Sequence, residues 1–175
     1  MQKTNIVLVG FMGTGKTAVG ELLAGQLGKT LVDMDSMIAE REGKSIPRIF
    51  AEDGEPRFRA LERALVQELA GRTDLVVSTG GGIVLNAANV EDFARSGLVV
   101  CLTATAETIL ERVGDDTNRP LLAVEDKLGK IKELLAVRQS YYDAVPCQLA
   151  TDGKSPAAVA AEICALYEPA DPPDQ

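Results

Sequence analysis

The chain has 175 residues, a formal net charge of −8 and no histidine. This length suits one domain, and the negative charge disfavours nucleic acids and anionic membranes as partners. Without histidine, Ser–His–Asp catalysis and His-ligated metal sites are excluded, so Asp or Glu is the expected general base, with Lys, Tyr and Cys as weaker alternatives.

Short β-branched runs alternate with longer helical stretches along the whole chain. Strands are expected at Asn5–Val9, Thr30–Asp33, Leu75–Ser78, Leu98–Leu102 and Cys147–Ala150. Helices are expected at Lys16–Leu27, Asp35–Glu42, Ser45–Ala51, Glu55–Ala70, Ala87–Arg95, Ala106–Val113, Lys127–Asp143 and Pro156–Tyr167. The almost continuously apolar strands suit a parallel sheet that is buried on both faces. The pattern therefore predicts a three-layer α/β domain, in which five parallel strands are flanked by helices and joined by right-handed crossovers.

Two segments depart from this simple alternation. Several helical stretches lie between the second and third strands, which is more than one crossover needs. Residues 114–120 read GDDTNRP and predict a mobile loop or lid, because they are polar and rich in turn formers. The tail Glu168–Gln175 holds three prolines in eight residues. We therefore expect a single domain over residues 1–168 and a disordered tail over residues 169–175.

The sequence also bears on cellular location. Its first residues lead directly into an apolar run without a cleavage site, so we expect no signal peptide. No apolar run approaches the roughly 20 residues that a membrane span needs. The three cysteines lie far apart without a Cys-x-x-Cys pair, which indicates reduced thiols rather than a disulfide framework or a metal site. A cytoplasmic protein is expected.

Residues 10–17 read GFMGTGKT and match the phosphate-binding pattern G-x-x-x-x-G-K-[ST] in full. The glycines allow a tight turn whose N–H groups point at phosphate oxygens. Lys16 supplies a positive charge for the β and γ phosphates, and Thr17 offers a hydroxyl to Mg²⁺. The pattern follows an apolar strand and opens a helix, which is the setting that it requires. The chain is therefore expected to bind a nucleoside triphosphate.

The class of P-loop protein follows partly from motifs that the sequence lacks. It lacks the Asn-Lys-x-Asp motif with which GTPases usually recognise the base. Motor and remodelling ATPases usually hold Mg²⁺ with an Asp at the end of an apolar strand, whereas the third expected strand here runs into residues 79–82 (TGGG). Asp33 and Asp35, after the second strand, are the alternative source of a carboxylate. Strand alternation would place both on one side, at the carboxyl end of the sheet. One carboxylate could organise Mg²⁺ through water while the other faces an acceptor hydroxyl, although Asp35 could instead merely cap the next helix.

Further motifs follow in order along the chain. They are Ile49-Phe50, Gly54-Glu55, Phe58-Arg59 with Glu62, the turn Gly80-Gly81-Gly82, Arg119-Pro120-Leu121-Leu122, and Arg138 with Tyr141-Tyr142. In these motifs, the P-loop and the aspartate pair, the chain resembles shikimate kinases over about residues 5–167. The resemblance implies a P-loop kinase fold, with a substrate-binding helical segment at about residues 34–62 and a lid loop at about residues 113–125.

Two features depart from the usual pattern of that family. Thr14 and Thr17 stand where alanine and serine are common, although Thr17 keeps the hydroxyl. Residues 114–116 are acidic, whereas a loop that closes over phosphates would gain from neutral or basic residues. We expect these aspartates to face solvent.

The resemblance implies transfer of the γ-phosphoryl group of ATP to the 3-hydroxyl of shikimate, in aromatic amino-acid and chorismate biosynthesis. Asp35, Lys16 and Arg119 would be the catalytic residues, and Arg119 would come down with the lid onto the phosphates. The nucleotide-binding residues would be Gly13, Thr14, Gly15, Lys16, Thr17, Ala18, Arg112, Arg119 and Pro156. Among these, Arg112 and Pro156 would sandwich the adenine.

The resemblance also implies the acceptor and metal contacts. Arg59 and Arg138 would bind the shikimate carboxylate, with Glu62 holding Arg59 in place. The other substrate-binding residues would be Asp35, Gly80, Gly81 and Gly82, whose backbone N–H groups can approach the substrate closely. Thr17 and Asp33 would serve the Mg²⁺ cofactor.

Two alternatives stay open. One is another small-metabolite kinase of this architecture, for gluconate or a nucleoside monophosphate, although the short lid with Arg119 and only Arg112 nearby argues against a nucleotide acceptor. The other is a nucleotide-dependent regulatory module that has lost catalysis. The sequence does not support it, because all the candidate catalytic positions are present: Lys16, Thr17, Asp33, Asp35 and Arg119. A monomer is expected, because no long apolar stripe is left once the core is assigned.

Overall fold

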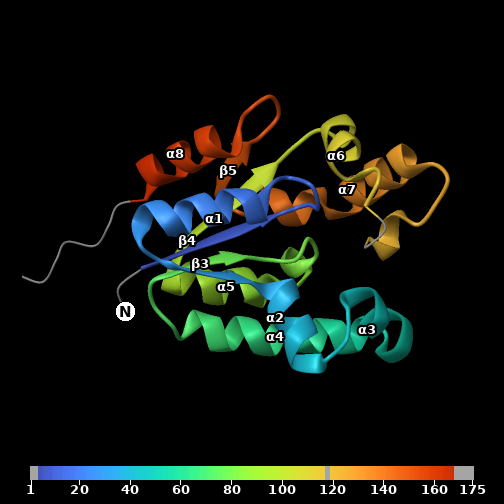
Figure 1. Ribbon diagram of the computed structural model, residues 1–175, viewed down its shortest axis with the longest axis horizontal. Coiled ribbons are helices and arrows are strands. Elements are labelled where there is room, and N and C mark those ends of the chain that lie inside the picture. The colour runs from blue at the N-terminus through green and yellow to red at the C-terminus, as the bar shows by residue number, and fades with distance from the viewer. Residues whose placement is uncertain (1–3, 117–118, 168–175) are drawn as a thin grey trace, which may run out of the picture.

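The computed structural model describes residues 4–116 and 119–167, which form a central sheet between two groups of helices (Figure 1). The strands are β1 (Asn5–Gly10), β2 (Thr30–Asp33), β3 (Leu75–Ser78), β4 (Gly97–Thr103) and β5 (Cys147–Ala150). They are arranged in the order β2-β3-β1-β4-β5, and all four pairings are parallel. The predicted three-layer α/β fold is confirmed. The expected disordered tail at residues 169–175 lies outside the described residues.

The helices follow the sequence pattern closely. They are α1 (Lys16–Leu27), α2 (Met34–Glu42), α3 (Ile46–Asp53), α4 (Glu55–Ala70), α5 (Ala87–Ser96), α6 (Ala106–Val113), α7 (Lys127–Asp143) and α8 (Pro156–Leu166), with short 3₁₀ helices η1 (Ile83–Leu85) and η2 (Pro120–Leu122). Every expected helix and strand is present, with ends that differ by at most two residues from the prediction. Within the described ranges, none of the helices has the length and apolar character that crossing a bilayer requires.

Helix starts are encoded locally by capping residues. The side chains of Ser45, Thr105 and Ser155 accept hydrogen bonds from the N–H groups of Arg48, Thr108 and Ala158, respectively. Such caps satisfy N–H groups that have no partner within the helix. This local chemistry explains why the helix boundaries could be predicted from the sequence.

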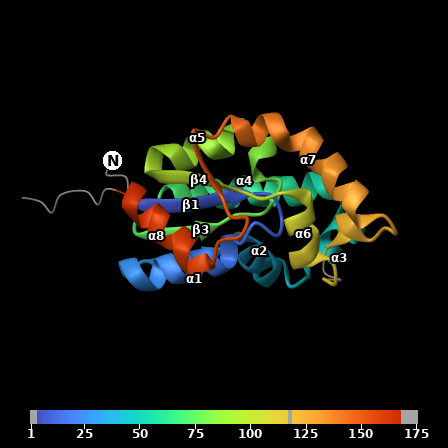
Figure 2. The same cartoon turned by 90° about the horizontal axis from the view of Figure 1, so that it is seen from above.

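The core lies on both faces of the sheet, with β1 at its centre. All six residues of β1 are buried, and alternate side chains enter different clusters. Ile6 and Leu8 pack with residues of α1 and α8, whereas Val7 and Val9 pack with residues of α4, α5 and α7. Figure 2 shows these two helical layers on opposite sides of the strands. A strand buried on both faces is apolar along most of its length, as β1 is from Ile6 to Val9. Its one polar residue, Asn5, donates to the Arg72 carbonyl and accepts from the Leu75 N–H.

The connection from β2 to α2 differs from the expectation. The strand passes directly into the helix, so Asp33 is the last strand residue and Asp35 lies in the first helical turn. Asp33 Oδ1 accepts a hydrogen bond from the N–H of Ser36 at 2.9 Å, which makes Asp33 the cap of α2. Strand alternation therefore does not align the two aspartates, although both line one cavity at the carboxyl end of the sheet, as predicted. The alternative that Asp35 caps the helix is wrong. Asp35 remains available for other contacts.

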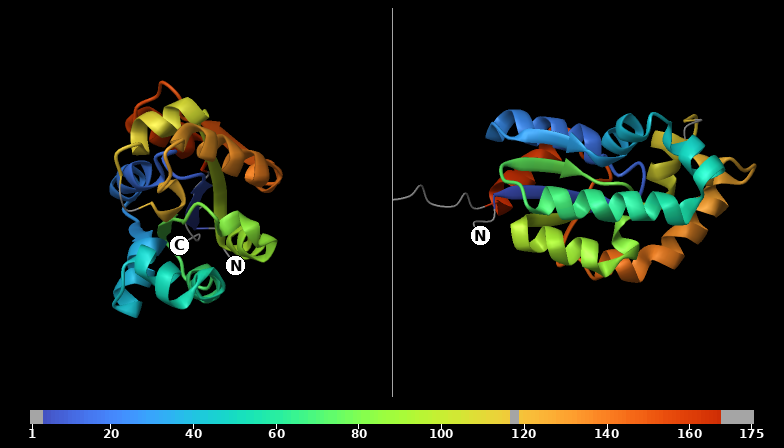
Figure 3. Two further views of the ribbon diagram at one scale, coloured as in Figure 1. Left: turned by 90° about the vertical axis from the view of Figure 1, so that its right-hand side faces the viewer. Right: turned by 90° about the horizontal axis from the view of Figure 1, so that it is seen from below.

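The carboxyl ends of the strands gather at one end of the molecule. The left panel of Figure 3 looks onto this end, where α2 and α3 lie on one side and α6 and α7 on the other. Parallel α/β sheets bind their ligands at this edge, outside the carboxyl ends of the strands.

Candidate active site

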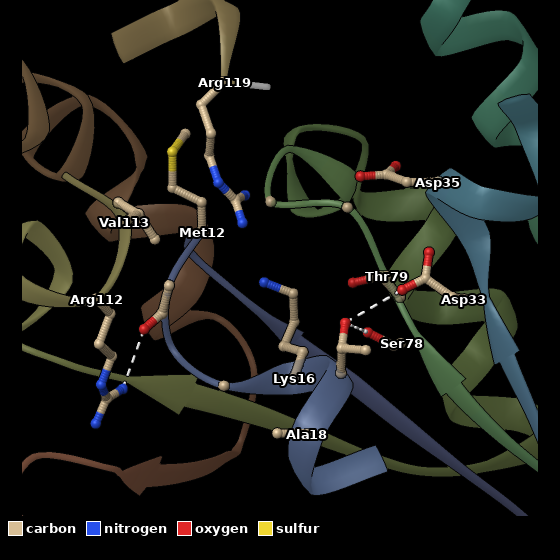
Figure 4. Close-up of a pocket in the computed structure, with 15 residues that line it drawn as sticks. Met12, Lys16, Ala18, Asp33, Asp35, Ser78, Thr79, Arg112, Val113 and Arg119 are labelled. Carbon is tan, nitrogen blue, oxygen red and sulfur yellow. Dashed lines mark hydrogen bonds between the residues drawn. The ribbon is translucent and has the colours of Figure 1, made fainter. Parts of the chain in front are cut away.

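Two adjoining cavities open at this end of the sheet. The larger, of about 380 Å³, is lined by the P-loop, Asp33 and the end of β3, and is here called the P-loop cavity (Figure 4). The smaller, of about 110 Å³, lies against α3 and α4 and contains Arg59 and Arg138, and is here called the arginine cavity. The residues that line both cavities are Met12, Asp35, Gly80, Gly81 and Arg119. Groups held in the two cavities would therefore meet at this shared wall.

The P-loop turns tightly at its glycines. Gly13 has a φ of 75°, and a Cβ at this position would lie 2.8 Å from Val113 Cγ1. Gly15 precedes α1 as its N-cap without a side-chain capping bond. The first N–H groups of α1 thus lie beside the P-loop cavity, which Lys16, Thr17 and Ala18 line. A helix N-terminus of this kind attracts anions.

Lys16 is buried and is held by the P-loop itself. Its Nζ donates hydrogen bonds to the carbonyl oxygens of Gly10 at 2.7 Å and Phe11 at 2.9 Å. Burial lowers the pKa of Lys16 to about 8, against the opposing charge of Asp35. Lys16 and Arg119 point into the P-loop cavity from opposite sides (Figure 4). The cavity therefore concentrates positive charge that an anion would stabilise.

Oxygen donors gather next to the P-loop. Thr17 Oγ1 donates a hydrogen bond to Asp33 Oδ2 at 3.2 Å and lies 3.5 Å from Ser78 Oγ (Figure 4). Oxygen ligands of this type suit Mg²⁺, which is commonly held by one or two protein groups together with phosphate oxygens and water. No cluster of three or more His, Cys, Asp or Glu residues suited to a metal occurs within the described ranges. Ser78 was not predicted, although its place at the end of a buried strand is a signal for it.

Two buried carboxylate oxygens lack partners. Within residues 4–116 and 119–167, Asp35 Oδ1 and Glu62 Oε1 are buried without a hydrogen bond. Each lies 3.0 Å from a Cβ built on Gly80, so both face the same place in the arginine cavity. Burial raises the pKa of both carboxyl groups. The charge of Asp33 adds to this rise for Asp35, whereas Arg59 opposes it for Glu62. Unpartnered buried oxygens are costly, which indicates a place where a ligand supplies hydrogen-bond donors.

Arg59 and Arg138 have different surroundings. Arg59 Nη1 donates to Glu62 Oε2 at 2.6 Å, and Arg59 also pairs with Glu55 at 3.2 Å. This confirms that Glu62, one helical turn later, contacts Arg59. Arg138 is only 6% exposed, and its guanidinium carbon lies 5.8 Å from the centre of the Phe11 ring. Among the described residues it forms no ion pair with a carboxylate, so its charge is available to an anion.

Arg119, in the segment predicted to form a lid, lines both cavities. Its Nε donates to Asp116 Oδ2 at 3.0 Å. Of the acidic residues that we expected to face solvent, Asp115 is exposed, whereas Asp116 makes this contact with Arg119. The expectation holds for Asp115 and only in part for Asp116, whose side chain is 35% exposed. Residues 117 and 118 of the predicted lid lie outside the described residues.

Arg112 and Pro156 line a third cavity of about 250 Å³, together with Thr14, Gly15 and Ala18. Arg112 Nη1 donates to the Gly13 carbonyl at 3.0 Å and to Thr151 Oγ1 at 3.1 Å. The arginine thereby links the P-loop to the segment after β5. Thr151 was missed by the sequence reasoning, although a polar turn that follows a strand directly is a signal for it.

Comparisons with known proteins identify the family of the chain. A family model described as shikimate kinase matches residues 12–168. A shikimate kinase of Pelotomaculum thermopropionicum is 48% identical over 151 residues, which cover 86% of this chain and 88% of that protein. The structure of shikimate kinase from Acinetobacter baumannii in complex with shikimate has a TM-score of 0.89 and 40% identity to this chain, and the match covers 93% of this chain and 92% of the other.

A more distant neighbour bears on the alternatives. A gluconokinase from Sinorhizobium meliloti has a TM-score of 0.58 at 20% identity, over 93% of this chain and 90% of the other, and so shares the fold alone. The gluconate and nucleoside monophosphate alternatives are not favoured, because the family model and the relative that is 48% identical are both shikimate kinases. The chain belongs to the shikimate kinase family.

Proposed function

We propose that the chain transfers the γ-phosphoryl group of ATP to the 3-hydroxyl of shikimate, giving shikimate 3-phosphate and ADP in aromatic amino-acid and chorismate biosynthesis. The observation that carries this proposal is the junction of the P-loop cavity with the arginine cavity at Asp35 and Gly80. Shikimate has a carboxylate that matches the two arginines and hydroxyls that match the unpartnered carboxylate oxygens. The shared wall would bring one such hydroxyl next to the terminal phosphate.

ATP would bind along the P-loop cavity. Its phosphates would contact the residues Gly13, Thr14, Gly15, Lys16, Thr17 and Ala18, and its adenine would lie between Arg112 and Pro156 in the adjoining third cavity. Lys16 and Arg119 would stabilise the charge that develops on the transferred group. Phosphoryl transfer depends mainly on positioning and on such electrostatic stabilisation.

Thr17 and Asp33 would hold Mg²⁺, directly or through water. Their oxygens already lie together beside the P-loop at 3.2 Å, and hard oxygen donors fit this ion. When bound, the ion neutralises phosphate charge. Asp33 would also keep α2 in place through its capping bond to Ser36, so that one side chain orders both the metal site and the helix that carries Asp35.

The acceptor would occupy the arginine cavity. Arg59 and Arg138 would bind its carboxylate, and the peptide groups of Gly80, Gly81 and Gly82 would contact its ring substituents. Asp35 would accept or orient the proton of the 3-hydroxyl as the oxygen attacks the phosphorus atom. In this proposal residues 34–62 form the substrate-binding segment and residues 113–125 the lid.

Arg138→Ala is expected to raise the Michaelis constant KM for shikimate about 10-fold to 100-fold, because a charge-assisted bond to the carboxylate would be lost. The KM for ATP should change little, since Arg138 lines the arginine cavity and not the P-loop cavity. Steady-state kinetics with each substrate varied in turn would measure both constants. Arg63→Ala is a suitable control, because Arg63 pairs with Asp92 away from both cavities. An unchanged KM for shikimate in Arg138→Ala would remove Arg138 from the acceptor site.

Gly82→Ala tests the placement of Arg59. A Cβ on Gly82 would lie 2.4 Å from Arg59 Nη2, whereas the backbone angles of Gly82, φ −97° and ψ 7°, are accessible to other residues. The variant should therefore fold and displace the guanidinium, which should raise the KM for shikimate about tenfold. Gly25→Ala is the matched control, because a Cβ there meets nothing within 4 Å. Equal KM values for shikimate in the two variants would show that acceptor binding does not depend on the position of Arg59 beside Gly82.

The direct test of the proposed function is ADP formation with Mg²⁺ and ATP in the presence of shikimate, gluconate, AMP or no acceptor. Turnover that requires shikimate is the expected result. A preparation that binds ATP but is not stimulated by shikimate would overturn the proposed acceptor. ATP hydrolysis at the same rate with and without an acceptor would revive the alternative of a regulatory module.

In this proposal the enzyme is a cytoplasmic monomer that binds small molecules, and neither nucleic acid nor membranes. The net charge of −8 supports the last two points. The exposed large apolar side chains among the described residues are spread over several elements: Leu22, Val124, Val137, Tyr141 and Leu166. A mass well above 18.6 kDa by light scattering at assay concentration would contradict the monomer.

A further inference from the structure

The glycine turn that separates the two cavities is anchored through its carbonyl groups. The Gly80 carbonyl accepts from the Ile83 N–H at 3.2 Å, and the Gly82 carbonyl accepts from the Leu85 N–H at 3.1 Å. Both bonds come from the adjacent 3₁₀ helix. The Gly81 carbonyl instead accepts from the Tyr142 hydroxyl at 2.6 Å, although Tyr142 lies 61 residues further along the chain, in α7. The middle of the turn is therefore held by a distant side chain.

The N–H groups of this turn point away from its carbonyl groups. A trans peptide is planar, so fixing a carbonyl also fixes the opposite direction of the following N–H. The bond from Tyr142 thus sets the orientation of the whole peptide between Gly81 and Gly82. Within the described part of the chain, the N–H groups of Gly80, Gly81 and Gly82 donate no hydrogen bond. All three glycines line the arginine cavity, so these N–H groups are candidate donors to an acceptor bound there.

The close neighbours of Gly81 leave its peptide group little freedom to move. A Cβ at Gly81 would lie 3.3 Å from the backbone nitrogen of Met12 and 3.7 Å from Arg138 Nη1. The turn therefore lies between the P-loop and the guanidinium proposed to bind the acceptor. A small rotation of this peptide would change its distance to both neighbours.

Tyr142 is built into the fold as a fixed donor. It is 3% exposed and follows Arg138 by one helical turn. Burial raises the pKa of Tyr142 to about 12, with Arg138 acting in the opposite direction, so the phenol stays protonated near neutral pH. Its side chain lines neither the P-loop cavity nor the arginine cavity. Any influence on the acceptor must therefore pass through Gly81 or Arg138.

We propose that Tyr142 is a positioning residue for the acceptor, whose hydroxyl holds the Gly81 peptide so that the glycine turn and Arg138 keep one fixed spacing. This inference deepens the proposed function and rests on it. The competing explanation is that the hydroxyl only satisfies a buried carbonyl and thereby contributes to stability. The two explanations differ in what they predict for the binding of the acceptor.

Tyr142→Phe distinguishes them, because it keeps the buried ring and removes only the hydroxyl. We expect the KM for shikimate to rise about fivefold to tenfold, which corresponds to the loss of one hydrogen bond. The KM for ATP should stay within about twofold. Calorimetric titration of shikimate into the nucleotide-free enzyme should show a similar loss of affinity. The unfolding midpoint Tm is measured in parallel.

The neighbouring Tyr141→Phe is the matched control. Tyr141 lies on the same helix, is 43% exposed, and its hydroxyl forms no hydrogen bond with the residues that the structure describes. This variant should keep wild-type constants. A Tyr142→Phe enzyme with a lowered Tm and an unchanged KM for shikimate would overturn the positioning role. Wild-type enzyme without shikimate-dependent turnover would instead refute the proposed function, so the two failures can be told apart.

Discussion

Asp35→Asn is expected to slow phosphoryl transfer to shikimate about 100-fold or more while leaving the affinity for ATP nearly unchanged. The amide keeps the shape of the carboxylate but cannot accept the proton of the acceptor hydroxyl, and the loss of a positioned general base typically has this magnitude. Asp35 is suited to the role because its Oδ1 is buried without a partner at the wall shared by the two cavities. Single-turnover kinetics and equilibrium binding of ATP would separate the two effects.

A control and a contradiction are available for this variant. Asp92→Asn changes a partly buried aspartate that pairs with Arg63 and Arg95 outside both cavities, and it should retain turnover. If Asp35→Asn kept more than about a tenth of the wild-type rate, Asp35 would be neither the base nor the orienting group.

The same substitution should also increase stability at neutral pH. Burial, and next the charge of Asp33, raise the pKa of Asp35 above its ordinary value, so the folded protein favours the protonated form. Stability from this group is present below the unfolded pKa and is lost as the pH rises through the folded pKa. Asp35→Asn should therefore unfold at a higher temperature than the wild type at pH 7, and the difference should shrink on acidification. A variant that is less stable than the wild type at pH 7 would contradict this reading.

Lys16→Met is expected to reduce kcat/KM for ATP about 1,000-fold. The ammonium group is the buried cation of the P-loop cavity, and a preorganised charge at a transferred phosphoryl group contributes on this scale. The hydrogen bonds from Nζ to the Gly10 and Phe11 carbonyls hold the group at the mouth of the loop in the absence of phosphate. Initial rates over a range of ATP concentrations, with shikimate saturating, would measure the loss.

Lys29→Met is a closely matched control. The Lys29 side chain is 9% exposed, and its Nζ donates to the Thr4 carbonyl at 2.7 Å and pairs with Asp74, far from the cavities. This variant should lose stability but keep its turnover. A similar loss of activity in both lysine variants would show that general destabilisation, rather than phosphate binding, explains the effect of Lys16→Met.

Lys16 also predicts a pH dependence. Because burial lowers its pKa to about 8 in the nucleotide-free protein, the ammonium form is depleted above that pH. Phosphate charge favours the ammonium form, so above this pH the binding of ATP is coupled to the uptake of a proton by Lys16 from solvent. The KM for ATP should therefore rise above about pH 8. A KM that stays constant to pH 9.5 would contradict the lowered pKa.

The sequence by itself determined the elements of the fold and the phosphate site. Strands such as β1 carry an apolar run from Ile6 to Val9, and helices such as α8 begin with a proline after a capping serine, Ser155. Residues 10–17 carry their glycines, lysine and threonine within one turn. These features depend on residues a few positions apart, so local patterns reveal them. The family resemblance then brought in Arg59 and Arg138, which are proposed to bind the carboxylate of the acceptor and whose separation in sequence gave no local reason to pair them.

Tertiary structure alone decided the contacts between distant segments. The strand order β2-β3-β1-β4-β5 places Ser78 beside Thr17, and Arg112 joins Gly13 to Thr151 across three elements. The turn into α2 moved Asp35 off the strand and made Asp33 the cap, because the chain enters the helix as soon as β2 ends. The bond from Tyr142 to Gly81 likewise exists only because α7 packs against the glycine turn. Such contacts depend on how elements pack, and packing brings together residues whose spacing along the chain carries no signal.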